Sequence, residues 1–231
     1  MFHSKRSLWL IVLSVIVSLA FVLAAYASNT PALRVMGDGL WHYRLDRNPS
    51  TGALKAKISV DFANPAVAVA YKQLNQRYAT HLIADSLGQA QKVDVTLTFA
   101  TPVSWEDVVA IRKETGLSVQ LYTFVALNEK GEKGSLTSIV KEDSLVDMHQ
   151  VAEVAAAQGY KLLGVMVIHG TVPNVPDGLG KLTADNRIYL VDVMANRVIQ
   201  DLLDRGDLDK LSRQDIYIHT PSPFWDMNWD G

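Results

Sequence analysis

The 231-residue chain contains no cysteine. Disulfide bonds, thiolate metal sites and cysteine nucleophiles are therefore excluded. A large excess of charge of one sign is also missing, because the chain has 22 lysines and arginines and 24 aspartates and glutamates, a net charge of −2. This balance gives no electrostatic reason to expect nucleic acid as a partner. Disordered and low-complexity classes are excluded too, since 48% of the residues are hydrophobic and 20% are charged.

Signatures of catalysis and of cofactor binding are absent as well. The sequence has no Gly-x-Ser-x-Gly elbow, no Walker loop, no dinucleotide-binding fingerprint and no His-Glu-x-x-His pair. The stretch Gly178-Leu179-Gly180 has no third glycine that opens a helix, so it is interpreted as a turn and not as a phosphate site. No cofactor is expected, and a binding role is favoured over an enzymatic one, which stays open.

A long stretch without charge, residues 7–27, dominates the N-terminus. At about 1.5 Å per residue it spans the roughly 30 Å hydrocarbon core of a bilayer. Lys5 and Arg6 precede it, so residues 1–6 are expected to form a cytoplasmic stub, with the rest of the chain outside. The same features, with Ala25-Tyr26-Ala27, also describe a cleaved signal peptide, which would make the protein secreted.

The remaining chain is expected to form one α+β domain outside the membrane. Residues 28–53 are interpreted as a linker, residues 54–215 as the domain and residues 216–231 as an aromatic tail. Residues 54–62 alternate between apolar and polar, which predicts a strand. Asn64-Pro65 then predicts a helix that runs to about residue 87.

From residue 92 to 170 the pattern predicts the order strand-helix-strand-strand-helix-strand. Ser104 and Asp107 resemble a capping box at the start of the first helix. The run 161–170 is almost wholly apolar and predicts a buried central strand. This order is that of the ferredoxin-like, split βαβ fold, an antiparallel sheet with two helices on one face. A strand at 188–193 and a helix at 196–203 are expected as additions.

Two segments resemble known families. The apolar run followed by KVDVTLTFATPVSWEDVVAIRKETGLSVQLYTFVAL is similar to the membrane-anchored, extracytoplasmic C-terminal domains of bacterial sigma-factor regulators. The stretch GVMVIHGTVPNVPDGLGKLTADNRIYLVDV resembles the strand-loop-strand ending of small ferredoxin-like modules such as subtilase propeptide domains. The matching residues are Leu182, Asp185, Arg187, Ile188, Val191 and Asp192. Neither resemblance carries catalytic residues, and both imply a module that contacts another protein.

Two sets of residues are candidates for chemistry. His169 follows one buried strand and Asp192 ends another, so neighbouring strands would let the carboxylate orient the imidazole for acid–base catalysis. Asp226, Asn228 and Asp230 match the opening of a calcium loop. The acid expected at position twelve of such a loop is missing, so no metal is expected.

We therefore expect a membrane-anchored, extracytoplasmic binding or sensory module that contacts an envelope protein or a ligand. Two alternatives stay open: an envelope hydrolase that uses His169 and Asp192, and a propeptide-like inhibitor of a secreted protease. A pocket shared by these two residues would support the hydrolase. A free edge strand would support the inhibitor.

Overall fold

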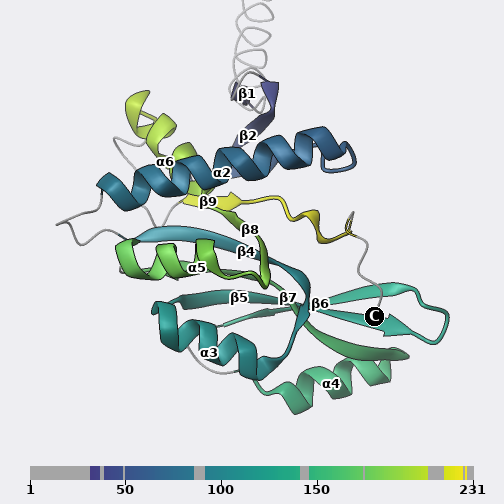
Figure 1. Cartoon of the computed structure of the whole chain (residues 1–231). Coiled ribbons are helices and arrows are strands. Elements are labelled where there is room, and N and C mark those ends of the chain that lie inside the picture. Colours follow the sequence, from purple (N-terminus) through teal and green to yellow (C-terminus); the bar gives the residue numbers. More distant parts are fainter. Residues whose placement is uncertain are drawn as a thin grey trace, which may run out of the picture.

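The computed structural model shows an α+β protein built on two β-sheets, one of five strands and one of four (Figure 1). Pairs of described strands are antiparallel, except for that between β3 (Leu54–Ser59) and β9 (Ile216–His219). The expected α+β class with a mostly antiparallel sheet is therefore confirmed. The structure describes residues 32–36, 39–48, 50–85, 92–140, 146–173, 175–207, 216–225 and 227.

The five-stranded sheet contains the predicted strand-helix-strand-strand-helix-strand order. Ser104 caps the first helix, because its Oγ accepts a hydrogen bond from the backbone N–H of Asp107 at 3.1 Å. The elements are β4 (Val93–Val103), α3 (Trp105–Thr115), β5 (Ser118–Asn128), β6 (Lys133–Ile139), α4 (Met148–Ala157) and β7 (Tyr160–Val172). Figure 1 shows α3 and α4 on the same side of this sheet, as expected.

The strands of this sheet lie in the order β6-β5-β7-β4-β8, where β8 (Ile188–Asp192) is the added strand. A ferredoxin-like sheet would instead place the first and third strands of the unit, here β4 and β6, side by side at its centre. The expected ferredoxin-like strand order is therefore wrong, because β4 and β6 are not neighbours. Burial explains the difference: β7 is buried over most of its length and takes the centre, whereas alternate residues of β6 are exposed and suit an edge.

The central position of β7 confirms the prediction from the apolar run 161–170. Val165 and Val167 are 0% and 1% exposed. Val165 belongs to the main core, whereas Val167 packs in a second cluster with Met166 and Phe224. The C-terminal segment, which contains Phe224, therefore supplies part of the cover of this strand.

The second sheet joins the first described residues to the C-terminal segment. β1 (Ala32–Met36), β2 (Trp41–Arg47) and β3 form an antiparallel meander, and β9 pairs with the free side of β3. The interpretation of residues 28–53 as a linker is therefore wrong where β1 and β2 lie. Burial of Trp41 and Tyr43 in the main core explains why this segment is a strand of the domain.

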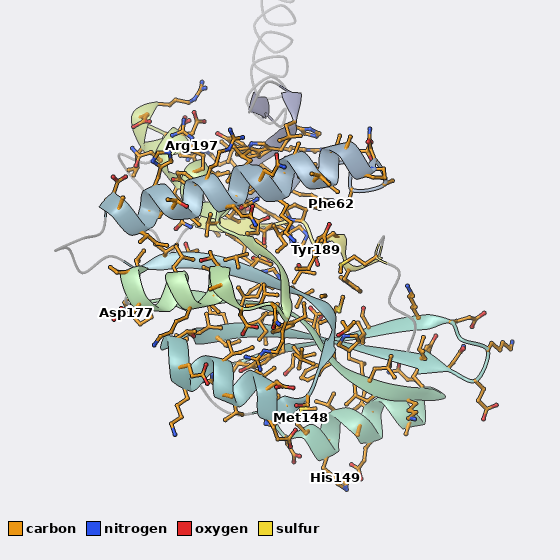
Figure 2. The ribbon with its side chains drawn as sticks, in the orientation of Figure 1. Phe62, Met148, His149, Asp177, Tyr189 and Arg197 are labelled. Atoms are coloured by element: carbon orange, nitrogen blue, oxygen red, sulfur yellow. The ribbon has the colours of Figure 1, made fainter. Side chains whose placement is uncertain are left out.

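Two helices connect the sheets. α2 (Pro65–Asp85) begins where Asn64-Pro65 predicts. Phe62, labelled in Figure 2, lies just before this helix, and its ring meets the Tyr71 ring edge-on at 5.6 Å between ring centres. α6 (Met194–Asp204) is tied to β2 by a hydrogen bond from the Tyr43 hydroxyl to Asp201. Because α2 also contacts β8, it lies along one side of the five-stranded sheet (Figure 1).

Candidate functional site

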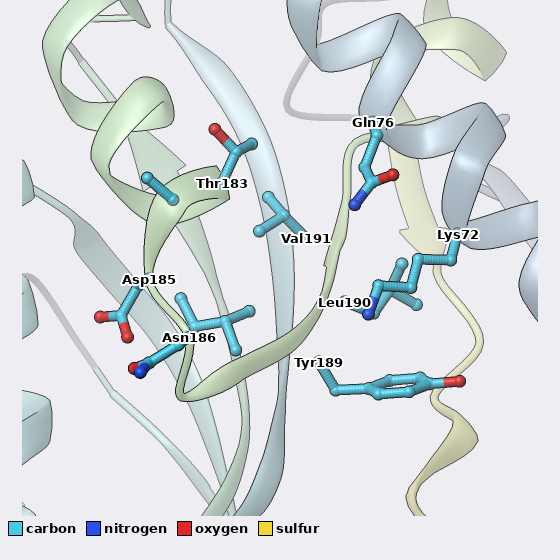
Figure 3. A pocket seen from close by; sticks show the side chains of 10 residues that line it. Lys72, Gln76, Thr183, Asp185, Asn186, Tyr189, Leu190 and Val191 are labelled. Carbon is cyan, nitrogen blue, oxygen red and sulfur yellow. The ribbon is translucent and has the colours of Figure 1, made fainter.

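A groove of about 260 Å³ opens between α2 and β8, beside the end of α5 (Gly180–Ala184). Lys72 and Gln76 reach into it from α2 (Figure 3). Tyr189 lines it from β8, and Asn186 from the turn before β8. The groove therefore has a helical wall on one side and a β-strand on the other.

The side of β8 that faces α2 is an edge of the five-stranded sheet. Among the described strands, β8 pairs with β4 alone. Directly after β8, the backbone N–H of Val193 donates a hydrogen bond to Asn75 Oδ1 of α2 at 2.9 Å. Backbone groups along a strand point alternately to its two sides, so the N–H of Val191 lies on the same side as that of Val193. The groove thus exposes strand backbone to which a further strand can pair.

Lys72 brings a positive charge to the groove. Its Nζ lies 4.5 Å from the centre of the Tyr189 ring, a cation–π geometry. Within the described ranges, no carboxylate forms an ion pair with this ammonium group. Asp185 also lines the groove, but both of its oxygens accept hydrogen bonds from Arg187. A carboxylate on a ligand would therefore complement the charge of Lys72.

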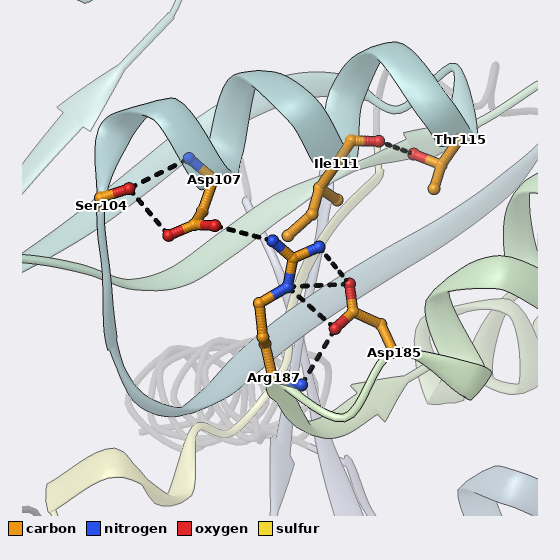
Figure 4. A network of polar contacts seen from close by, with 6 residues as sticks. All are labelled: Ser104, Asp107, Ile111, Thr115, Asp185 and Arg187. Carbon is orange, nitrogen blue, oxygen red and sulfur yellow. Dashed lines mark hydrogen bonds and ion pairs between the residues drawn. The ribbon is translucent and has the colours of Figure 1, made fainter.

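An ion-pair network fixes the start of β8 (Figure 4). Arg187 donates from Nε and Nη2 to Asp185 at 2.7–3.2 Å, and from Nη1 to Asp107 of α3 at 2.8 Å. Hydrogen bonds from Arg187 hold the pKa of Asp185 below its usual value. Those from Ser104 and then Arg187 lower the pKa of Asp107. Two residues that carry the resemblance to propeptide modules, Asp185 and Arg187, therefore hold β8 against α3.

A buried carboxyl group holds the other end of β8. Asp192 is 1% exposed, and its Oδ2 accepts a hydrogen bond from the Tyr71 hydroxyl of α2 at 2.8 Å. Its Oδ1 accepts one from the N–H of Met194 at 2.9 Å. Burial raises the pKa of Asp192 to about 6, although both hydrogen bonds oppose the rise. With both ends of β8 tied to helices, the groove is organised before any ligand binds.

His169 and Asp192 do not meet, so the expectation of a histidine–carboxylate pair is wrong. β4 lies between their strands, and both residues stand opposite Thr96. Strands two apart in a sheet are separated by roughly 10 Å. The His169 Nδ1 instead forms a hydrogen bond with the Thr96 Oγ1 at 2.9 Å. Burial, followed by the charge of His219, lowers the pKa of His169 to about 4.

The other predicted sites lie outside the described residues. This applies to Asp226, Asn228 and Asp230, the calcium-loop candidates, and to the apolar run 7–27. In the part of the chain that the structure describes, no group of three or more histidines and acids could hold a metal ion. Of the helices described, none is both long enough and apolar enough to cross a bilayer.

Sequence reasoning did not identify the groove. It predicted a helix from Asn64-Pro65 to about residue 87 and gave no role to Lys72, Asn75 or Gln76. The only signal in the sequence is that these three polar residues recur at helical spacing within that helix. Their use depends on β8 being an edge strand, and nothing local in the sequence indicates its neighbours.

Comparisons with protein-family models, with curated proteins and with solved structures find no match for this chain. The interpretation of the groove therefore depends on its own geometry.

Proposed function

We propose that this chain is a binding module, anchored by residues 7–27 with its domain outside the cytoplasm, that holds an extended segment of an envelope protein against β8. The observation that carries this proposal is the open edge of β8 inside a groove. An extended segment adds to such an edge through main-chain hydrogen bonds, which supply affinity. Lys5 and Arg6 before the apolar run support the orientation in the membrane.

The walls of the groove supply specificity to this binding. Lys72 favours an acidic side chain on the bound segment, and the Tyr189 ring offers an apolar surface beside it. The amides of Gln76 and Asn186 can donate and accept hydrogen bonds at the two sides. The bound segment is therefore short, extended and acidic at one position.

A propeptide-like protease inhibitor is a second candidate, because β8 is the strand on which the resemblance to subtilase propeptide domains depends. In that case the extended segment belongs to a secreted protease. Loss of subtilisin-type protease activity on addition of the full chain, restored by a substitution at the β8 edge, would favour this candidate. The hydrolase alternative has lost the residue pair on which it depended.

Short random peptides on a display library, screened against the full chain in detergent micelles, test the proposed function. We expect the selected peptides to carry an acidic residue. Val191→Pro should lower the affinity for these peptides at least about tenfold, because proline removes a backbone donor at the edge and is tolerated in edge strands.

Two lysine variants complete this test. Lys72→Ala should lower the affinity for the same peptides, because the positive charge in the groove is lost. Lys113→Ala, on the exposed surface of α3, should leave their affinity unchanged. Peptides that bind the Val191→Pro variant as tightly as the parent chain would contradict the proposal.

A further inference from the structure

The outer face of the four-stranded sheet carries a cluster of basic side chains. The strand register places Arg44 opposite Lys57, and Lys57 opposite His219. Lys55 is two residues from Lys57 on β3, where residues alternate between buried and exposed and both lysines are exposed. We refer to Arg44, Lys55, Lys57 and His219 together as the basic face.

The positive charge of the basic face is only partly compensated. Asp46 is the one carboxylate in the sequences of β2, β3 and β9, and its Oδ1 lies 3.2 Å from the Arg44 Nε. Burial, and then the charges of Lys57 and Lys55, lower the pKa of His219, so the positive charge of the face at neutral pH comes from Arg44, Lys55 and Lys57. The whole chain has a net charge of −2, so the charge of this face is opposite in sign to that of the chain as a whole.

We propose that the basic face binds the surface of a bilayer that contains anionic lipids. This inference rests on the proposed anchoring by residues 7–27. The step from residue 27 to Ala32, where β1 begins, spans at most about 18 Å, so an anchor holds this sheet close to the bilayer. A flat array of cations and a flat anionic surface meet at several points at once.

The ring of Tyr217 supports a membrane surface as the occupant. Tyr217 of β9 stands opposite Lys55 of β3 and is 57% exposed, although it is a large aromatic residue. Tyrosine is enriched where a protein meets the interface of a bilayer, because its ring is apolar and its hydroxyl group is polar. The net charge of the chain does not indicate this local positive cluster, because acidic residues outnumber basic ones in the rest of the chain.

A fluorescent label on the basic face tests the inference. Since the chain has no cysteine, Tyr217→Cys creates a single labelling site on this face. Leu203→Cys, at a residue of α6 that is 51% exposed, creates the control site. The labelled full-length chains are placed in nanodiscs of phosphatidylcholine, with or without phosphatidylglycerol. Co-purification with both kinds of disc reports the anchor separately from the basic face.

We expect the emission of the label at position 217 to shift in discs with phosphatidylglycerol and not in discs of phosphatidylcholine alone. The label at position 203 should not respond. High salt should abolish the shift, because it screens surface charge. Lys55→Glu/Lys57→Glu should abolish it too, whereas Lys113→Glu/Lys130→Glu, with the same change in net charge, should retain it.

A shift of equal size in phosphatidylcholine discs would overturn the inference, as would a shift that survives Lys55→Glu/Lys57→Glu or no shift at all. An equal response to soluble heparin without lipid would also overturn it, because the site would then bind polyanions in general. If the chain does not enter the discs, vesicles of the same two compositions replace them. There, Lys55→Glu/Lys57→Glu should weaken binding to the anionic vesicles at least about tenfold.

Discussion

Val165 lies in the middle of the central strand, with none of its surface exposed. Val165→Asp would bury a carboxylate without a partner, which costs several kcal/mol out of a typical total stability of about 5–15 kcal/mol. We expect this variant not to fold, seen as loss of the cooperative melt in circular dichroism. Lys161→Asp, at an exposed position near the start of the same strand, should change stability by no more than about 0.5 kcal/mol. A parent-like melt of Val165→Asp would contradict the burial of β7.

Gly170, also in β7, leaves no room for a methyl group. A Cβ at this position would overlap the backbone carbonyl oxygen of Ser118 on β5. Gly170→Ala should therefore force the two strands apart and lower the free energy of unfolding by about 1–3 kcal/mol in a urea titration. Gly180→Ala is the matched control, because no atom lies within 4 Å of the added Cβ. Equal losses in the two variants would contradict this account of the β5–β7 contact.

At the scale of elements, the five-stranded sheet holds the buried Asp192 and the half-buried His169, whose pKa values are shifted in opposite directions. Asp192 has its pKa raised from 3.8 to about 6, so the folded state retains its proton longer and stability falls as the pH rises through 6. His169 has its pKa lowered from 6.5 to about 4, so its contribution is present above pH 6.5 and is lost as the pH falls toward 4. The two effects partly cancel in the parent chain.

Asp192→Asn should remove the first effect and leave the second. The asparagine Oδ1 can still accept from the Met194 N–H, and its Nδ2 can donate to the Tyr71 hydroxyl. As the pH rises from 4 to 7, the free energy of unfolding of the variant should increase by up to about 3 kcal/mol relative to that of the parent, measured by urea unfolding in mild detergent. It should also lose stability more steeply on acidification, because the effect of His169 is then unopposed. Parallel pH profiles would contradict the raised pKa of Asp192.

At the scale of the whole molecule, the basic residues before the apolar run set the expected orientation. Lys5 and Arg6 precede residues 7–27, which have no charge, so the folded part is expected outside the cytoplasm. A reporter enzyme that is active only outside the cytoplasm should be active when fused after Gly231. Silence of that fusion, together with activity of a cytoplasmic reporter at the same position, would contradict the orientation.

The sequence by itself determined the local elements of this protein. Asn64-Pro65 marks the first turn of α2, alternation marks β3, and the apolar run 161–170 marks the strand that takes the centre of the sheet. These signals succeed because capping, side-chain alternation and hydrophobicity act over a few residues of the chain. The same signals missed β1 and β2. Tyr43 of β2 is buried where its hydroxyl group bonds Asp201 of α6, a contact between residues far apart in the chain.

Only the tertiary structure decided which strands are neighbours, because strand order depends on how all faces of the sheet are covered at once. With β4 between their strands, His169 and Asp192 cannot act together. The same order leaves β8 at the edge, where α2 turns that edge into a groove. Pairing of β9 with β3 likewise places His219 beside Lys57 on the basic face, a contact between residues too far apart in sequence for any local pattern to indicate.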